Sequence, residues 1–329
     1  MSELPFRLDL VQFLVEHRNP YLTLFFQSFT FLGSLEGYIL VIALVYAAYD
    51  KKLAVRLAVV TLLTMSVNHI LKTLIRNPRP FIRDHTYLQK WAVSPEAAAD
   101  LATEYSTPSG HAMASASFFT YLGAATSQGY LKTGFALVVV LIGLSRPYLG
   151  VHYFEDVLSG WVLGALVAYV CVRNAHRVGA RWNQLCLGGR AIALTLSSGV
   201  LWLVTRALSD WSGGDPPSAF ISYAGLLTGI LIAQPLEDKL VHFDPRGSSM
   251  CKKAVRYALA VAIVIGILSL FKAAFSAISI DSTPLGQALR YVRYAAAGIA
   301  GLLVAPWLFV RVGLAEATRA EEGREGRCG

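Results

Sequence analysis

Charged residues are scarce in this 329-residue sequence, where Asp, Glu, Lys and Arg make up 15%, against about 25% in a typical soluble domain. Hydrophobic residues make up 55%, and they fall in long runs instead of alternating with polar residues. Runs of about 20 apolar residues match the thickness of the hydrocarbon core of a bilayer. The composition therefore excludes an ordinary water-soluble domain and predicts an integral membrane protein.

Cysteines and repeats are also few. The four cysteines, Cys171, Cys186, Cys251 and Cys328, do not have the spacing of metal ligands, so we expect inert thiols, no metal site and no cofactor. No tandem repeat points to a solenoid. The first residues lack the basic region, apolar stretch and cleavage site of a removable signal peptide. Residues 8–15 are expected instead to form an amphipathic helix on the membrane surface.

The net charge of +8 would suit a nucleic-acid partner if the basic residues were clustered on one face. They lie instead in short connections between the apolar runs, where membrane proteins carry the charges that fix their orientation. We therefore expect membrane lipids, and no nucleic acid, as partners.

The apolar runs predict an all-α, polytopic transmembrane helical bundle of about eight or nine spans. Four parts follow along the chain: an interfacial amphipathic N-terminal helix within 1–20, a membrane core at 21–175, additional C-terminal transmembrane helices at 176–315, and a polar tail at 316–329 that is expected to be disordered. The expected spans cover residues 25–49, 53–75, 112–127, 134–149, 157–172, 191–207, 219–235, 255–274 and 294–309.

Basic residues gather on one side of this predicted bundle, here called side B, which includes Lys51, Lys52, Lys132, Arg173 and Arg246. The positive-inside rule places side B in the cytoplasm. The opposite side, side A, is then expected to face the periplasm of a bacterial inner membrane, or a lumen.

Three polar clusters interrupt the apolar runs, and ionisable groups at such places usually serve a function. Because the predicted spans alternate in direction, all three clusters emerge on side A. They comprise Lys72 and Arg79-Pro80, then Pro108-Ser109-Gly110-His111, and then Ser145-Arg146 with His152 and Asp156.

The cationic members of these clusters suit a phosphate dianion. Lys72, Arg79 and Arg146 would converge three positive charges, and arginine adds bidentate hydrogen bonding. Pro108 favours the start of a helix, so the backbone N–H groups of Ser109 and Gly110 are expected to form an anion site there. Taken singly, Lys72 also fits an interfacial anchor and Arg79 a solvated loop charge.

The two histidines suit phosphoryl transfer. Asp156 follows His152 by four residues, so on a helix the carboxylate can accept a hydrogen bond from one ring nitrogen and leave the other as a nucleophile. His111 can protonate the leaving oxygen as a general acid. Singly, a His and an Asp at this spacing are common on ordinary helices.

Together, Lys-x6-Arg-Pro, Pro-Ser-Gly-His and Ser-Arg-x5-His-x3-Asp resemble the signature of the type-2 phosphatidic acid phosphatase superfamily, over about a third of the chain. The resemblance implies a helical, metal-independent phosphatase site in which His152 forms a phosphohistidine, Asp156 orients it and His111 serves the leaving group. It also implies that Lys72, Arg79, Ser109, Gly110 and Arg146 hold the phosphoryl oxygens. Soluble vanadate-dependent haloperoxidases share the signature, but the predicted spans favour a phosphatase.

Several functional alternatives stay open from the sequence. Glucose 6-phosphatase-like enzymes share this core, a phosphotransferase would pass the phosphoryl group to another lipid, and a transporter or scaffold would use the extra spans. Candidate substrates are phosphatidic acid, phosphatidylglycerol phosphate, polyprenyl pyrophosphate, a sphingoid base phosphate and lipid A. The side A loop over 81–107 is expected to select among them, with Tyr87 and Trp91 as contacts. Asn68 and His69 are expected to be packed and hydrogen-bonded, and Glu36 and the Glu237-Asp238 pair have no assigned role.

Overall fold

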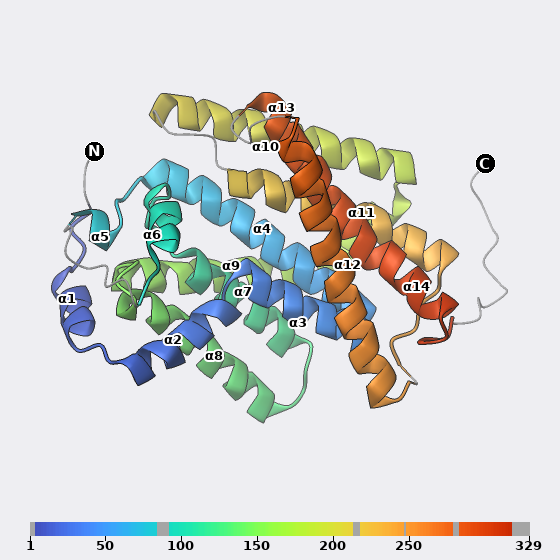
Figure 1. The fold of residues 1–329 in the computed structure, drawn as a ribbon, viewed down its shortest axis with the longest axis horizontal. Helices are drawn as coiled ribbons and strands as arrows, with labels where there is room; N and C mark the ends of the chain where they lie inside the picture. Colours follow the sequence, from blue (N-terminus) through green and yellow to red (C-terminus); the bar gives the residue numbers. More distant parts are fainter. Residues whose placement is uncertain (1–3, 84–91, 213–217, 247, 279–282, 318–329) are drawn as a thin grey trace. The chain divides into compact units, whose positions relative to one another are not determined.

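The computed structural model describes residues 4–83, 92–212, 218–246, 248–278 and 283–317. Within these ranges the structure is helical apart from turns, loops and an isolated β-bridge between Phe243 and Ala317. The all-α fold predicted from the sequence is confirmed. In chain order (Figure 1) the helices are α1 Asp9–Glu16, α2 Pro20–Leu32, α3 Leu35–Ala48, α4 Lys51–Ile75, α5 Pro80–Arg83, α6 Pro95–Ala102, α7 Gly110–Ala124, α8 Gly129–Tyr148, α9 Phe154–Gln184, α10 Leu187–Ser212, α11 Ser218–Leu240, α12 Met250–Ser276, α13 Pro284–Ile299, a π-helix Ala300–Val304 and α14 Ala305–Arg311.

Seven helical segments among the described residues are long and apolar enough to cross a membrane, or eight if α2 and α3 together make one broken span. The expected span at 112–127 corresponds to α7, which has 15 residues. A helix of that length is shorter than the usual range for a transmembrane helix. Most residues of α7 are buried by protein, so this helix lies inside the bundle and does not face lipid.

The first predicted span, at 25–49, is wrong in one respect, because the structure divides it into α2 and α3 with a bend of 61°. Gly33 ends α2, and its N–H donates to the carbonyl oxygens of Phe29 and Thr30 at 3.0 and 3.1 Å. A Cβ atom at Gly37 would lie 2.4 Å from the Phe31 carbonyl oxygen. The tight contact at the break therefore depends on a residue without a side chain.

The chain forms two compact units that interleave along the sequence. Unit 1 contains Met1–Val41, Arg56–Leu185 and Leu196–Ala224, and unit 2 contains Ile42–Val55, Cys186–Thr195 and Gly225–Gly329. The division into a core at 21–175 and additional helices at 176–315 stays a prediction.

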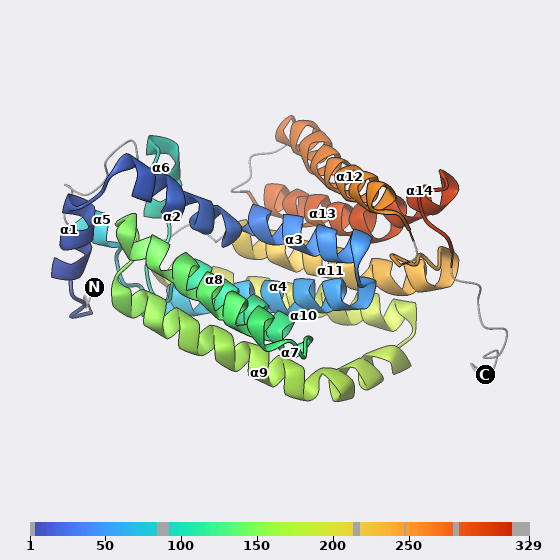
Figure 2. The same ribbon diagram turned by 90° about the horizontal axis from the view of Figure 1, so that it is seen from below.

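In unit 1, α7 packs closely against both α8 and α9 (Figure 2). The contact with α9 depends on two glycines one turn apart. A Cβ atom at Gly164 would lie 2.2 Å from the Met113 carbonyl oxygen, and one at Gly160 would lie 2.9 Å from that of Ser109. Because the two backbones touch, the Ser109 N–H donates to the Asp156 carbonyl oxygen at 3.0 Å. This packing brings the second and third polar clusters together.

The N-terminal segment also contacts the polar clusters of unit 1. The short helices α1, α5 and α6 lie at one end of the long helices of this unit (Figure 1). The N–H of Leu4 donates to Asn77 Oδ1 at 3.3 Å, and the N–H of Arg7 donates to Glu155 Oε1 at 3.1 Å. α1 lies within the segment where an amphipathic helix was predicted. Its buried face joins a hydrophobic cluster of Val11, Val15, Phe81, Ala92, Tyr148, Leu149, Val151 and Tyr153.

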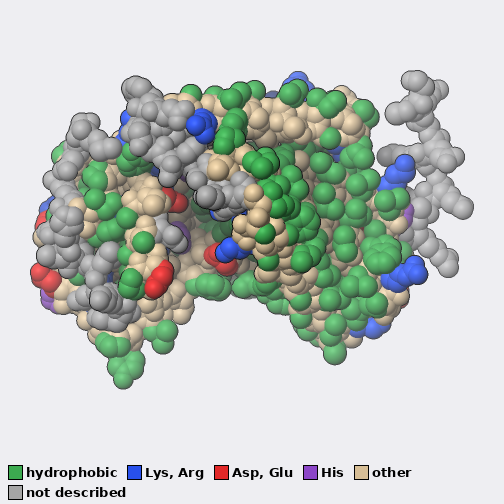
Figure 3. Space-filling view, turned by 45° about the horizontal axis from the view of Figure 1, so that its top comes forward, with side chains coloured by type: hydrophobic (Ala, Val, Ile, Leu, Met, Phe, Trp, Pro, Cys, Tyr) green, Lys and Arg blue, Asp and Glu red, His purple; other side chains and the backbone are tan. Residues whose placement is uncertain are grey.

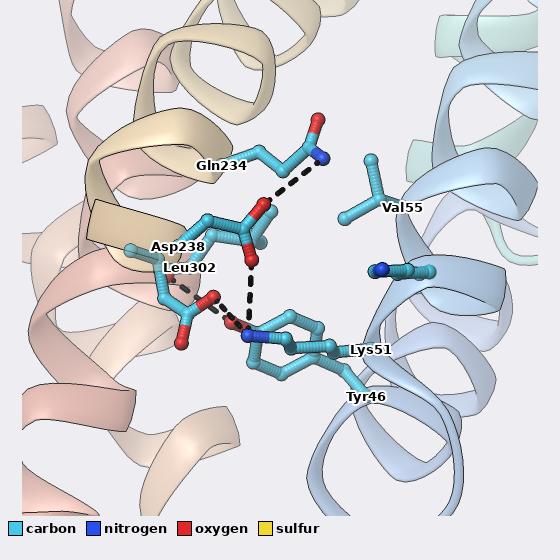
Figure 4. Close-up of a pocket in the computed structure, with 8 residues that line it drawn as sticks. Tyr46, Lys51, Val55, Gln234, Asp238 and Leu302 are labelled. Carbon is cyan, nitrogen blue, oxygen red and sulfur yellow. Dashed lines mark hydrogen bonds and ion pairs between the residues drawn. The ribbon is translucent and has the colours of Figure 1, made fainter. Parts of the chain in front are cut away.

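In unit 2, Lys51 lies between the two carboxylates of Glu237 and Asp238 (Figure 4), with N···O distances of 2.7 and 3.1 Å. Glu237 is buried, and its other oxygen accepts the N–H of Phe243 at 2.8 Å. The acidic pair thus shares one lysine. This pair, which had no assigned role in the sequence, is a structural clamp between the start of α4 and the end of α11.

Hydrophobic side chains cover much of the outer surface, and Figure 3 shows charged side chains to be sparse on the face that it draws. Large apolar residues are exposed along the long helices, and such a surface suits lipid better than water. Examples are Val162 on α9, Leu196 and Leu203 on α10, and Ile265 and Leu270 on α12.

Candidate active site

The three polar clusters meet in unit 1 where several helices end or begin. Lys72 lies in the last turn of α4, and Arg79 directly precedes α5. Arg146 lies in the last turn of α8, and Asp156 in the first turn of α9. His152 stands between these two helices, and its side chain is buried.

The His152 ring is held by a different partner at each nitrogen. Arg79 Nη1 lies 3.0 Å from His152 Nε2. Arginine can only donate hydrogen bonds, so Nε2 accepts and the ring proton is assigned to Nδ1. Nδ1 lies 3.3 Å from both Asp156 Oδ2 and the Ser106 hydroxyl oxygen, and both of these atoms can accept a hydrogen bond from that proton. This tautomer leaves the lone pair on Nε2, as a nucleophile requires.

Asp156 is itself fixed by several donors. Its Oδ2 accepts the backbone N–H of Tyr153 at 2.9 Å and a short hydrogen bond from the Ser106 hydroxyl. Its Oδ1 accepts the Thr107 hydroxyl at 2.5 Å. The side chain is fully buried. A buried carboxylate with this many donors is held in one orientation, and it therefore holds the imidazole in turn.

Lys72 and Arg79 share one anionic partner, Glu104. Its Oε2 atom lies 2.8 Å from Lys72 Nζ and 3.3 Å from Arg79 Nη2. Arg79 Nε also donates to the Glu104 carbonyl oxygen at 3.1 Å. Both cations are buried, and buried charges of this kind need a counter-ion. In this structure the counter-ion is the carboxylate of Glu104.

Arg146, from the last turn of α8, is also buried. Its Nη1 donates to Thr30 Oγ1 at 3.3 Å, and Thr30 pairs with Ser145 at 2.6 Å. The Arg146 Nε atom has no hydrogen-bond partner among the described residues. This guanidinium therefore keeps unused donor capacity for an anion.

The second cluster begins α7, as the sequence predicted. The Ser109 N–H is used by the Asp156 carbonyl oxygen, so the buried Ser109 hydroxyl, which has no partner in the described structure, is the group left for a ligand. Gly110 lies against Asn68, where a Cβ atom would be 3.2 Å from Asn68 Oδ1. No hydrogen bond in the described parts of the chain joins His111 to His152 or Asp156, and its role as an acid stays a prediction.

Five polar residues outside the motifs support the site, and three of them, Glu104, Ser106 and Thr107, come from the stretch just before Pro108. Asn77, between Lys72 and Arg79, donates to Thr107 Oγ1 at 3.1 Å. Asn68 donates to the Pro108 carbonyl oxygen at 3.0 Å, in line with the packed role expected for it. His69 is buried as expected, but its Nε2 lacks a partner within the described ranges. The only sequence signal for these residues was their closeness to the motifs.

Two expected contacts, Tyr87 and Trp91, lie outside the described residues. No group of three or more His, Cys, Asp or Glu residues within the described ranges is arranged to hold a metal ion.

His152 and Glu104 lie outside the spanning helices, and the charges around them shift the pKa of each. Burial, followed by the charges of Arg79, Arg146 and Lys72, lowers the pKa of His152 well below its ordinary value of 6.5. The Lys72 ammonium, helped by Arg79, holds the pKa of Glu104 far below its usual range. At neutral pH, His152 is therefore a neutral base and Glu104 an anion.

Comparison with known families agrees with this arrangement. Residues 53–180 match the model described as PAP2 superfamily, and residues 221–317 match PAP2 superfamily phosphatase, transmembrane extension. The chain carries a PAP2 domain followed by the transmembrane extension of that family. All residues of the three polar clusters fall inside the PAP2 domain.

Individual relatives of this PAP2 protein are lipid phosphatases by name. It is 30% identical to an undecaprenyl-diphosphatase from Sulfolobus acidocaldarius over 37% of this chain and 55% of the relative. It is also 30% identical to human sphingosine-1-phosphate phosphatase 2, over 46% of this chain and 37% of the relative. The chain thus spans about half or less of these relatives. The crystal structure of Aquifex aeolicus LpxE matches 53% of this chain and 99% of its own, with 23% identity and a TM-score of 0.44.

Proposed function

We propose that this PAP2 protein is a metal-independent phosphatase that hydrolyses a phosphomonoester or pyrophosphate of a lipid through a phosphohistidine on His152. The observation that carries the proposal is the buried Asp156–His152 pair with a lone pair on Nε2, beside the paired cations Lys72 and Arg79. A neutral imidazole next to concentrated positive charge suits attack on a phosphate dianion.

The reaction proceeds in two balanced steps. His152 Nε2 attacks phosphorus, the ester or anhydride P–O bond breaks, and the leaving oxygen takes a proton from His111. His111 then removes a proton from water, the hydroxide attacks phosphorus, and the P–N bond returns its electrons to His152. In both steps Lys72, Arg79 and Arg146 stabilise the charge that builds on the phosphoryl oxygens, and the Ser109 hydroxyl and the Gly110 N–H donate to them. Arg79 must therefore turn from Nε2 to the phosphoryl group when the substrate binds.

A lipid substrate follows from the setting of the site and from the relatives. The surrounding helices expose apolar surface suited to a bilayer, and the names of both relatives specify lipid phosphates or diphosphates. These names cover chemically different lipids, so the shared chemistry is a terminal phosphoryl group on an amphiphile.

A panel of lipids tests this function. Phosphate release is measured with phosphatidic acid, phosphatidylglycerol phosphate, a polyprenyl pyrophosphate and sphingosine 1-phosphate, each with excess EDTA. We expect release from at least one lipid and no loss of activity with the chelator. Abolition by EDTA would refute the metal-independent mechanism, and transfer of labelled phosphate to another lipid instead of water would indicate a phosphotransferase.

We further propose that the site faces the periplasm of a bacterial inner membrane, or a lumen, because basic residues concentrate on side B. Ala97 on α6 and Cys251 at the start of α12 are both exposed. In intact cells, a membrane-impermeant maleimide is expected to label an Ala97→Cys variant at the new cysteine, but to label Cys251 only after lysis. The reverse pattern would invert the topology.

The acid limb of the pH profile is expected to be displaced because of the lowered pKa of His152. The parameter kcat/KM, which reports the free enzyme, should not fall as the pH is lowered from 8 to 6.5, since the nucleophile stays neutral there and lower pH favours the protonated form of the acid His111. Below this range the unfolded histidine takes up a proton that the folded one does not, so the free energy of unfolding should fall as the pH decreases. A kcat/KM that halves between pH 8 and 6.5 would show an unshifted nucleophile.

A further inference from the structure

We propose that Glu104 is an internal anion that keeps the phosphodiester headgroups of ordinary lipids out of the phosphate site, so that only a more highly charged terminal phosphate displaces it. Glu104 would then be a specificity-determining residue. The inference rests on the proposed function, because it assumes that Lys72 and Arg79 receive the phosphoryl group of the substrate.

The position of the Glu104 carboxylate is the first support. One oxygen, Oε2, contacts Lys72 Nζ and Arg79 Nη2 at 2.8 and 3.3 Å. These cations are the ones that the first sequence motif assigns to phosphate. A phosphoryl oxygen bound between these same two nitrogen atoms would take the place of Oε2, so Glu104 competes with any ligand that binds there.

The second support is that Glu104 is held loosely in comparison with Asp156. Its side chain is 41% exposed, and it lies in the irregular stretch between α6 and α7. Within the described structure its carboxylate bonds only to the two cations. Asp156, in contrast, is fully buried and accepts hydrogen bonds from Ser106, Thr107 and Tyr153. Glu104 can therefore swing toward solvent without unfolding a helix.

Charge decides which ligands can compete. A phosphodiester headgroup carries one negative charge, like the carboxylate, whereas a phosphomonoester carries about −1.5 to −2 at pH 7. A tethered carboxylate also acts at a high effective concentration, so it excludes a free anion of equal charge. The more highly charged monoester gains more from Lys72 and Arg79 and displaces it. Such exclusion matters in a bilayer, where phosphodiesters far outnumber any phosphomonoester.

Inhibition by a short-chain phosphodiester tests the proposal. Dihexanoyl phosphatidylglycerol is titrated against hydrolysis of the best substrate from the lipid panel, in the wild type and in Glu104→Gln. We expect the inhibition constant to fall at least about tenfold in Glu104→Gln, because neutralising the carboxylate frees both cations. Glu104→Asp, which keeps the charge, should stay near the wild type. The matched control is Glu96→Gln, which removes an exposed charge from α6 and should leave the constant unchanged.

A binding measurement without turnover keeps the two proposals separable. The melting temperature of each purified protein is followed with increasing phosphatidylglycerol or inorganic phosphate. A larger ligand-induced rise in Glu104→Gln than in the wild type supports the exclusion role even if no panel lipid is hydrolysed, in which case only the proposed function fails. Equal or weaker binding by Glu104→Gln, with hydrolysis intact, overturns the exclusion role alone and leaves Glu104 as a structural counter-ion.

Discussion

Replacing His152 with alanine is expected to lower the rate of phosphate release by about 10⁴-fold or more. Removal of a single residue of a protease catalytic triad has an effect of this size. The lone pair on Nε2 faces the anion-binding guanidinium of Arg79, which donates to that atom. Steady-state hydrolysis of the best panel lipid, in detergent or in nanodiscs, measures the effect.

The control for this substitution is His176→Ala, which removes an exposed imidazole from α9 and should retain full activity. Trapping gives an independent readout, because wild-type protein denatured in detergent at alkaline pH, where the acid-labile P–N bond persists, should retain labelled phosphate on a histidine and the His152→Ala protein should not. Activity within tenfold of the wild type, with an unchanged melting temperature, would mean that another group attacks phosphorus.

Asp156→Asn is expected to lower kcat by about 10³- to 10⁴-fold while the protein still binds inorganic phosphate, because the comparable change in a Ser-His-Asp triad disturbs the histidine tautomer to this extent. The Asp156 oxygens accept four hydrogen bonds, and an amide NH₂ would face at least one of those donors. The imidazole would then lose the partner that keeps its proton on Nδ1. Single-turnover kinetics and phosphate binding by thermal shift measure the two effects separately.

The matched change is Asp9→Asn, since Asp9 is exposed and makes only a surface ion pair with Arg7, a contact worth little in water. It should leave kcat unchanged. If Asp156→Asn instead reduced phosphate binding while kcat per bound substrate survived, Asp156 would shape the anion pocket and not the nucleophile.

The motif residues could be chosen as candidates from the sequence because each motif is local. His152 and Asp156 lie four residues apart, and Ser109 and Gly110 begin a helix, so a short window contains the chemistry. Alternating spans then placed the clusters on one side without knowledge of their contacts. The bend at Gly33 was missed, because Gly33-Ser34 permits a kink but does not require one inside a long apolar run.

Glu104, Ser106 and Thr107 could not be predicted in their roles, since those roles depend on contacts with residues 25 to 50 positions away. A Glu in a polar loop has the same local pattern whether it is solvated or paired with buried cations. Asn77 illustrates the same limit, because its bond to Leu4 depends on how the N-terminal segment folds back and its bond to Thr107 joins residues 30 positions apart.

That folded-back segment connects an exposed apolar surface to the chemistry. Leu10 and Phe13 are exposed on α1, while a relay of hydrogen bonds runs from Leu4 through Asn77 and Thr107 to the carboxylate that steadies the nucleophile. Contact of those two apolar side chains with lipid would couple the lateral pressure of the leaflet to the position of the His152 imidazole. Turnover would then vary with the host membrane, and a micelle that releases α1 would give a slower catalyst from an intact fold.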